Sequence, residues 1–346
     1  MSSPPVPRDP FPRSGSATED VVGAQRRHLR ALQATGRLSP PLPAGGATAR
    51  RWAALAGWGS EDLVLARLAE GHVDAVAVLA EAGAPAPADA LLGVWASASE
   101  GTGLRAARLP DGGLRLDGLL RYASGARVLD AALVTTTDEA GGRRLVLLDL
   151  RAPGVVVRPG TWAAVGMDDS DSLDVAVDGV EVPASAVVGP PGFYVERPGL
   201  HIGGMGVAAV WWGGARGVVR SLTAALARAE AAGRPATPHQ LAHLGAASSA
   251  VHRGAALLAA AAAAVDAAPL ETHAVRALRV RHEVEQVVEE VLRRSGRATG
   301  ATPLCRDADH ARRTADLAVY VRQQHADGDL EHLGRAVLDR AAPERA

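Results

Sequence analysis

The chain has 346 residues, of which 47% are hydrophobic and 22% are charged, and its mean hydropathy is +0.04. This composition excludes global disorder and is typical of a soluble globular protein with two or three domains. All 37 basic residues are arginine, so lysine-dependent chemistry such as Schiff bases with pyridoxal phosphate is excluded. The formal net charge of −1 argues against nucleic-acid binding, which needs a basic surface.

Cysteine usage and apolar segments indicate the compartment. The single cysteine, Cys305, excludes an internal disulfide and a cysteine-only metal site, and we expect no metal centre. The proline-rich start at 1–13 lacks the apolar core of a secretory signal. The most apolar runs, 203–215 and 254–265, stop short of the roughly 18 residues needed to cross a bilayer. We therefore predict a cytoplasmic protein without a membrane partner.

The N-terminal part is predicted to be helical after a loose start. Residues 1–45 are rich in Pro, Ser and Gly and contain one short helical stretch at 21–35, so we expect a flexible arm. From 46 to about 90, apolar residues recur at helical spacing, and Ser60 is a plausible N-cap. This pattern predicts a shortened N-terminal helical domain over 46–90.

The middle and C-terminal parts have different textures. Between 91 and 190, short apolar runs alternate with glycine-rich turns, which predicts a compact antiparallel β domain. Over 195–346 the pattern returns to long helical segments, which we place at 205–230, 238–264, 273–295 and 306–325. Short connections between them predict an antiparallel four-helix bundle. The expected fold class is α+β, in the order helical domain, middle β domain and C-terminal four-helix bundle.

Several strings in this order resemble the acyl-CoA dehydrogenase superfamily. The strongest is GLLRYASGA at 118–126, followed by DAALV at 130–134, which is similar to a strand pair of that family. The segment 162–189 resembles a second signature of the family, 208–217 resembles its first bundle helix, and RDA at 306–308 resembles the start of its last helix. The resemblance implies the same three-domain fold and a flavin held between the β domain and the bundle.

The resemblance also implies which residues contact the flavin. Tyr122 and Ser124 stand where the family has its ring-stacking aromatic residue and its hydroxyl donor to the flavin N5. Trp95, Ser97 and Ser99 lie in the loop where the family contacts the pyrimidine edge and the pyrophosphate. A structural interpretation remains open, in which Tyr122 fills the β domain and Ser124 is a turn residue.

FAD is the cofactor that the resemblance implies, with FMN as an alternative. The adenosine contacts of the family are not preserved after the first bundle helix, and Arg228 is the nearest arginine. A guanidinium pairs well with pyrophosphate, although Arg228 is equally compatible with a charge on the helix surface. The gap leaves open that a partner delivers reduced FMN.

The expected catalytic base is missing from the sequence. Dehydrogenation of an acyl thioester needs a base, which in the family is usually a glutamate in the bundle. Counting back from Arg306 without gaps places this position at Ala298, and the nearest alternative, Glu196, comes several residues too early. His72 and His325 resemble active-site histidines of the flavin-dependent monooxygenase branch, although each is also compatible with an exposed or capping helical histidine.

Three functions therefore remain open. The first is a flavin-dependent oxidoreductase of acyl-CoA dehydrogenase type, which acts on the CH–CH group of an acyl thioester and passes electrons to an acceptor. The second is a reduced-flavin-dependent monooxygenase supplied by a flavin reductase, and the third is a catalytically silent partner subunit. We expect a homodimer or homotetramer, because the apolar helices at 205–225 and 254–264 have too little polar surface to be solvated on all sides.

Overall fold

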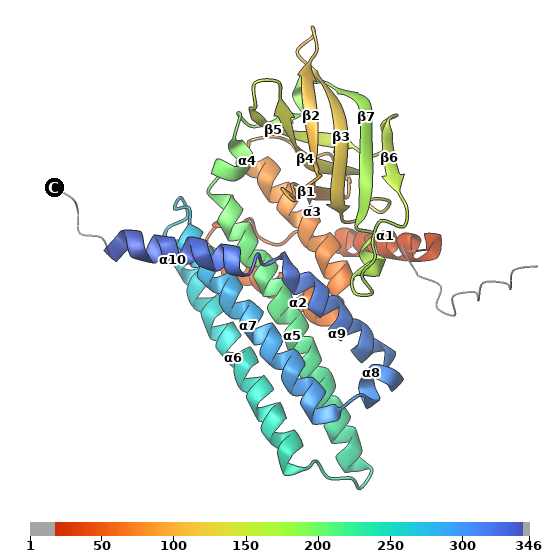
Figure 1. The fold of residues 1–346 in the computed structure, drawn as a ribbon, viewed down its shortest axis with the longest axis vertical. Coiled ribbons are helices and arrows are strands. Elements are labelled where there is room, and N and C mark those ends of the chain that lie inside the picture. The colour runs from red at the N-terminus through yellow and green to blue at the C-terminus, as the bar shows by residue number, and fades with distance from the viewer. Residues whose placement is uncertain (1–17, 342–346) are drawn as a thin grey trace, which may run out of the picture.

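The computed structural model describes residues 18–341, which form two helical regions with a sheet between them along the chain (Figure 1). The first helical region consists of α1 (Glu19–Ala34), α2 (Thr48–Glu61) and α3 (Leu63–Glu81). The strands are β1 (Leu92–Trp95), β2 (Gly103–Arg108), β3 (Leu114–Ala123), β4 (Ala131–Asp138), β5 (Arg143–Asp149), β6 (Val155–Arg158), β7 (Leu173–Val182) and β8 (Val187–Val188). The second helical region consists of α4 (Phe193–Glu196), α5 (Gly199–Ala231), α6 (Pro238–Ala267), α7 (Ala274–Thr299), α8 (Thr302–Arg306), α9 (Ala308–Tyr320) and α10 (Asp327–Ala341). This order confirms the predicted α+β fold class.

Helix α1 is fixed to the sheet region by ion pairs. Arg26 and Arg30 both pair with the carboxylate of Asp130, and the apolar face of the helix is buried. Residues 19–34, which the sequence assigned to a flexible arm, thus form a packed helix. The start of the predicted arm, 1–17, lies outside the described residues.

The sheet is mixed, whereas the sequence predicted an antiparallel one. Its strand order is β6-β7-β3-β2-β4-β5-β8, with β1 paired to β4. Both β1 and β2 run parallel to β4, and the remaining pairs are antiparallel. Parallel pairs need a crossover connection, so strands far apart in sequence come together at β4. Local turn chemistry predicts hairpins such as β2–β3 and does not predict such crossovers.

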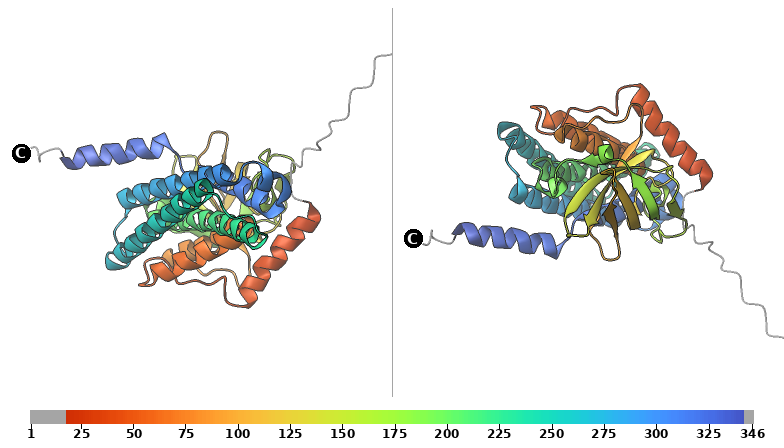
Figure 2. Two further views of the ribbon diagram at one scale, coloured as in Figure 1. Left: turned by 90° about the horizontal axis from the view of Figure 1, so that it is seen from below. Right: turned by 90° about the horizontal axis from the view of Figure 1, so that it is seen from above.

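The three longest helices, α5, α6 and α7, lie side by side, and α9 packs against α5 (Figures 1 and 2). The helix predicted over 306–325 is interrupted. Helix α8 ends at Arg306, and the Asp307 side chain accepts a hydrogen bond from the His310 N–H at the start of α9. Helix α9 has 13 residues, whereas α5 has 33, and α10 continues beyond the bundle (Figure 1).

Helix α6 is longer than the apolar run seen in the sequence. Its length and apolar composition would suit a membrane span, and it is the one such helix among residues 18–341. A single helix of this kind is weak evidence for a span, because core helices of soluble proteins meet the same criteria. Helix α6 packs along α7, and the absence of a membrane partner stays a prediction.

Helix α3 lies between the sheet and the bundle. It contacts β1 on one side and α5 and α9 on the other. Helices α2 and α5 approach closely through glycine, because a Cβ atom at Gly59 would lie 2.3 Å from the Val210 carbonyl oxygen. At Gly213 a Cβ atom would lie 2.2 Å from the Ala56 carbonyl oxygen. This close packing joins α2 to α5, while the contacts of α3 with β1, α5 and α9 make α3 the wall between the two parts of the molecule.

Candidate functional site

A cleft lies where the sheet, α3 and the C-terminal helices meet. It has two connected parts, which we call the sheet-side chamber, of about 630 Å³, and the helix-side chamber, of about 520 Å³. Both volumes fall in the range of ordinary small-molecule sites. The residues that line both chambers are Arg67, Val94, Tyr194, Arg281, Gln323 and His325.

Most of the predicted flavin residues meet in the sheet-side chamber. The predicted residues that line it are Trp95, Ser97, Ser99, Tyr122, Ser124 and His325. The hydroxyls of Ser97 and Ser99 lie 2.9 Å apart in an exposed loop. Their roles toward a cofactor remain predictions, but their common position in one cavity follows from the fold.

The end of β3 and the tight turn that follows it present Tyr122 and Ser124, respectively, to this chamber. Tyr122 has a φ of +59°, in the left-handed region that non-glycine residues rarely adopt, and 54% of its surface is exposed. Trp95 donates a hydrogen bond of 3.0 Å from Nε1 to the Ser124 carbonyl oxygen, which fixes the turn from β1. Such strained backbone clusters at functional sites.

Three buried hydroxyls form a chain along the chamber wall. Ser124 Oγ lies 2.8 Å from Ser172 Oγ, which lies 2.7 Å from Ser170 Oγ. Ser170 Oγ in turn donates a hydrogen bond of 2.5 Å to the Met167 carbonyl oxygen. We call Ser124, Ser172 and Ser170 the serine chain. It joins the turn after β3 to the loop before β7.

The far end of the serine chain is held by α9. The Met167 N–H donates a 2.6 Å hydrogen bond to Asp316 Oδ1, and Met167 has a φ of +59°. Burial raises the pKa of Asp316 to about 6, although the Met167 hydrogen bond opposes this rise. A Cβ atom at Gly166 would lie 2.1 Å from the Ala315 carbonyl oxygen, so only glycine allows the loop to approach α9 this closely.

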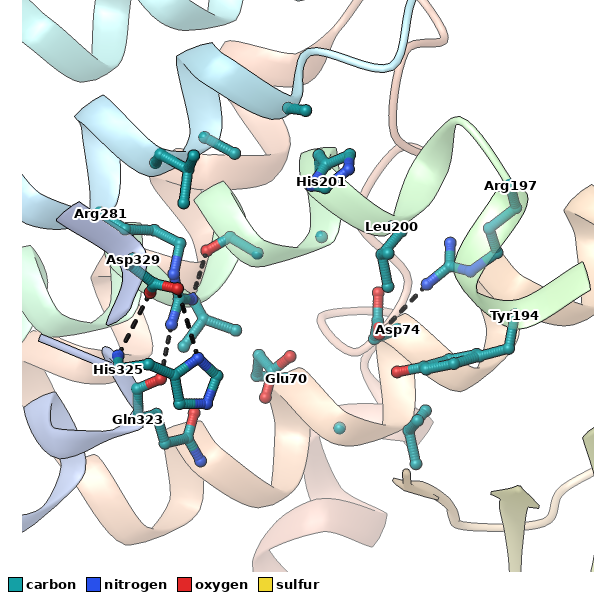
Figure 3. Close-up of a pocket in the computed structure, with 18 of the residues that line it drawn as sticks. Glu70, Asp74, Tyr194, Arg197, Leu200, His201, Arg281, Gln323, His325 and Asp329 are labelled. Atoms are coloured by element: carbon teal, nitrogen blue, oxygen red, sulfur yellow. Dashed lines mark hydrogen bonds and ion pairs between the residues drawn. The ribbon is translucent and has the colours of Figure 1, made fainter. Parts of the chain in front are cut away.

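The helix-side chamber is lined by charged groups from several helices. Figure 3 shows Glu70 from α3 between two groups of polar side chains. One group contains Arg281, Gln323, His325 and Asp329, and the other contains Asp74, Tyr194 and Arg197. Arg67 donates a 2.6 Å hydrogen bond to Glu70, and burial raises the pKa of Glu70 in spite of this partner.

Arg281 joins the helices that close the cleft. Its guanidinium donates to the carbonyl oxygens of Gly204 at 3.1 Å and Gln323 at 2.7 Å, and it lies over the Trp211 ring at 4.7 Å. Burial lowers the pKa of Arg281. These contacts fix the turn before α10, where the exposed His325 ring lies 3.5 Å from the Asp329 carboxylate.

The charge of the two chambers differs. The sheet-side chamber is lined by Arg67, Arg121, Arg281 and Arg322 and by no carboxylate among the residues described. The carboxylates Glu70, Asp74 and Asp329 all line the helix-side chamber. Across residues 18–341, no group of three or more His, Cys, Asp or Glu side chains is arranged to hold a metal ion.

His72, predicted to be catalytic, does not line either chamber. Its Nδ1 accepts a 3.0 Å hydrogen bond from the Leu92 N–H of β1, and the residue is buried. Burial, assisted by the charge of Arg30, lowers the pKa of His72 to about 4. A buried, neutral imidazole that holds a strand is a structural group, so the structure gives no support to the predicted catalytic role.

The predicted adenosine contact and the gapless glutamate position also lie outside the cleft. Arg228 is exposed in the last turn of α5 and lines neither chamber. Ala298 is buried against Leu222 and Leu226, 17 residues beyond Arg281, or about 25 Å along the helix. The gapless count from Arg306 crosses the short helix α8 and the junction before it, which separate α7 from α9. The exposed Glu196 lines neither chamber either.

Sequence reasoning missed most of the helix-side chamber. Arg67, Glu70 and Asp74 recur at helical spacing on the mostly apolar α3, and this pattern was a usable signal. Arg281 and Tyr320 come from distant helices, and no local pattern marks them. The 3% exposed Tyr320 lies beside Arg67 on the wall of the sheet-side chamber.

Comparisons with known proteins identify the fold. No protein-family model matches the chain, and no curated protein matches it in sequence. Among solved structures, FMN-bound TdsC from Paenibacillus sp. A11-2, a dibenzothiophene monooxygenase, is similar to it with 20% identity, over 94% of this chain and 98% of TdsC, at a TM-score of 0.74.

Two further structures have different activities. KijD3, solved with FMN and a dTDP-linked amino keto sugar, is 18% identical over 96% of this chain and 89% of its own, at a TM-score of 0.77. Butyryl-CoA dehydrogenase from Megasphaera elsdenii is 17% identical over 94% of this chain and 91% of its own, also at 0.77. At such identities the likeness shows the fold alone. The chain has the acyl-CoA dehydrogenase fold that its sequence strings predict.

Proposed function

We propose that the chain is a flavin-dependent oxidoreductase that uses reduced FMN and dioxygen to oxygenate a small polar substrate. The observation that carries the proposal is the division of charge in the cleft. The chamber lined by Tyr122, Ser124 and four arginines has no carboxylate among its described residues, and the carboxylates line the adjoining chamber. A substrate in the helix-side chamber would therefore meet the flavin across Arg67, Tyr194 and His325.

The sheet-side chamber fits a flavin on three counts. Its volume of about 630 Å³ is that of a cofactor site. The buried Nε–H of Arg67 makes no hydrogen bond in the described part of the chain, so it can donate to a ligand. The four arginines suit a phosphate and an electron-rich ring, because guanidinium groups bind phosphate in bidentate fashion.

FMN is proposed over FAD because the predicted adenosine contact, Arg228, lies outside the cleft. The FMN-bound structures of TdsC and KijD3, which share the fold, add support. A separate flavin reductase would supply the reduced form.

The residues of the cleft have separate roles in this proposal. When bound, reduced flavin supplies two electrons to dioxygen, so that one oxygen atom enters the substrate and the other leaves as water. Tyr122 and Trp95 form the aromatic wall beside the ring, and Arg67 orients it from α3. His325 and the Glu70 carboxyl can each hold or pass a proton at the junction of the chambers.

The visible absorption spectrum of the purified protein tests this function. We expect a nearly colourless protein that binds photoreduced FMN anaerobically and consumes dioxygen when air is admitted. A yellow protein whose bound flavin is bleached by butyryl-CoA under anaerobic conditions would contradict the proposal and support a dehydrogenase.

Dehydrogenation of an acyl thioester is the second candidate, and Glu70 is the observation that favours it. This carboxyl lines the helix-side chamber, and its raised pKa suits a general base. If Glu70 is the base, Glu70→Gln should abolish flavin bleaching by butyryl-CoA. Replacement of the exposed Glu283 of α7, which lines neither chamber, by Gln is the matched control and should leave bleaching unchanged.

We also propose that the chain forms at least a homodimer. Only 33% of the most apolar 18-residue stretch of α6 is buried, so much of this apolar helix faces outward. Light scattering at micromolar concentration should give at least twice the chain mass. A value of about 35.5 kDa would contradict this proposal.

A further inference from the structure

The protons of the serine chain can be arranged in one direction only. Because the Met167 carbonyl oxygen can only accept, the single hydroxyl proton of Ser170 is committed to it. The 2.7 Å contact between Ser172 and Ser170 then needs the proton of Ser172. By the same count, the 2.8 Å contact between Ser124 and Ser172 needs the proton of Ser124. Ser124 Oγ therefore meets the chamber with lone pairs and without a proton.

The surroundings fix this direction. Ser170, Ser172 and Ser124 are 0%, 5% and 8% exposed, so little of the serine chain is open to competition from solvent. The Met167 carbonyl also accepts the Ser170 backbone N–H at 3.1 Å, which occupies its second lone pair. A reversed chain would leave the Ser170 and Met167 oxygens 2.5 Å apart with no proton between them. Asp316 holds the Met167 N–H and keeps the carbonyl in place.

We propose that the serine chain makes this site selective for reduced over oxidised flavin. The N5 atom of the flavin ring is a bare acceptor when oxidised and an N–H donor when reduced. An Oγ atom that can only accept forms a hydrogen bond with the reduced ring and opposes a lone pair on the oxidised ring. The inference rests on the proposed flavin site and on the implied position of Ser124 at N5, and it reverses the predicted role of Ser124 as a donor.

Ser170 and Ser172 are the positioning residues in this device, since they act on the flavin through Ser124. A hydrogen bond gained with one redox state and a lone-pair clash with the other should separate the two affinities by about 10-fold to 100-fold. Such a site takes up reduced flavin from solution and releases the oxidised product.

The dissociation constants of the two redox states of FMN test the inference without any substrate. Oxidised FMN is titrated by quenching of its fluorescence, and photoreduced FMN by anaerobic calorimetry. We expect the wild-type protein to bind reduced FMN at least 10-fold more tightly. A 10-fold ratio raises the midpoint potential of bound FMN by about 30 mV relative to free FMN.

Ser170→Ala is the sharpest variant, because it keeps Ser124 and Ser172 and removes only the fixed end of the chain. Ser172 can then donate to Ser124, which becomes free to donate to N5. We expect the affinity ratio to fall toward one through tighter binding of oxidised FMN, a gain that a damaged site would not produce. Ser172→Ala should act in the same direction. Thr136→Val removes a buried hydroxyl of β4 that has no hydrogen-bond partner among residues 18–341, and as the control it should keep the wild-type ratio.

The possible results distinguish failure of this inference from failure of the proposed flavin-dependent function. A wild-type protein that binds both redox states equally, or binds oxidised FMN more tightly, would overturn the inference and leave a flavin enzyme. An unchanged ratio in folded Ser170→Ala, checked by circular dichroism, would also overturn it. Binding of neither form would overturn the proposed function, and the inference with it.

Discussion

The two chambers of the cleft differ in how the chain builds them. The sheet-side chamber takes its serine hydroxyls from three segments next to strands, after β1, after β3 and before β7. Backbone hydrogen bonds such as that from Gly125 N–H to the Ser170 carbonyl join the last two. The helix-side chamber takes its charges from α3, the turn between α4 and α5, α7 and α10, and ion pairs such as Arg67–Glu70 and Arg197–Asp74 hold them. A chamber whose residues come from short continuous segments can be detected from sequence motifs. A chamber made where helices cross is visible only in the fold.

Ala298→Glu tests the boundary between the helix-side chamber and the remote end of the bundle. The new carboxylate would be buried against Leu222 and Leu226 without a cationic partner among the buried contacts, so we expect a loss of about 4 kcal/mol in the free energy of unfolding. Urea denaturation measures this loss, and the exposed Ala259→Glu is the control. Normal stability together with faster acyl-CoA turnover would restore Ala298 as the position of the family base.

Arg67→Met tests the ion pair that joins the chambers. Removing Arg67 leaves the Glu70 carboxylate buried and uncompensated, which should cost about 3 kcal/mol at pH 8. Because burial raises the pKa of Glu70, the carboxyl takes up a proton more readily at pH 5, and the loss should be smaller there. Addition of Glu70→Gln should recover stability at pH 8. Equal losses of Arg67→Met at both pH values would show that the pair contributes through packing alone.

His72→Gln tests the assignment of this residue to structure. The pKa of His72 is lowered from 6.5 to about 4, so the unfolded chain binds the proton first as pH falls. The wild-type protein should therefore lose about 3 kcal/mol of stability between pH 6.5 and pH 4 through this residue. The variant should lose less over this interval, because glutamine does not titrate, whereas the exposed His28→Gln should match the wild type. A steeper decline in His72→Gln would contradict the assignment.

Ser124→Ala should have the smallest effect. It removes one hydrogen-bonding group from the sheet-side chamber and should weaken binding of reduced FMN by about 1.5 kcal/mol, or roughly 10-fold. Anaerobic calorimetry measures the change, with Thr136→Val as the control. Unchanged affinity would indicate that Ser124 is only a turn residue, as the alternative interpretation of the sequence holds.

The sequence predicted the fold because its family-like motifs occur along the chain in the same order as the helices and strands to which they correspond. It predicted much of the sheet-side chamber for the same reason, since Tyr122 and Ser124 belong to one string and Ser172 belongs to another. Its error at α3 has a geometric cause. Glu70 and His72 stand two residues apart, so they point about 200° apart around the helix, and only Glu70 faces the cleft. The sequence motif alone does not show whether Glu70 or His72 faces the cleft.

Residues without a local string could not be predicted. Arg281 is one of several arginines on α7, and only the tertiary packing places it over Trp211 and beside the turn at Gln323. The parallel pairs of β1 and β2 with β4 likewise depend on tertiary packing and not on a local turn. The direction of the serine chain depends on Met167 and Asp316, which are 149 residues apart.

The position of Arg67 has a thermodynamic consequence. Its guanidinium lines both chambers, and its Nε–H has no hydrogen-bond partner among the described residues. A ligand that recruits Arg67 in one chamber changes the field and the available donors in the other. Coupling of this kind is reciprocal, so the factor by which flavin alters substrate affinity equals the factor by which substrate alters flavin affinity. A single arginine shared by both chambers would thus couple the affinities of two ligands bound side by side.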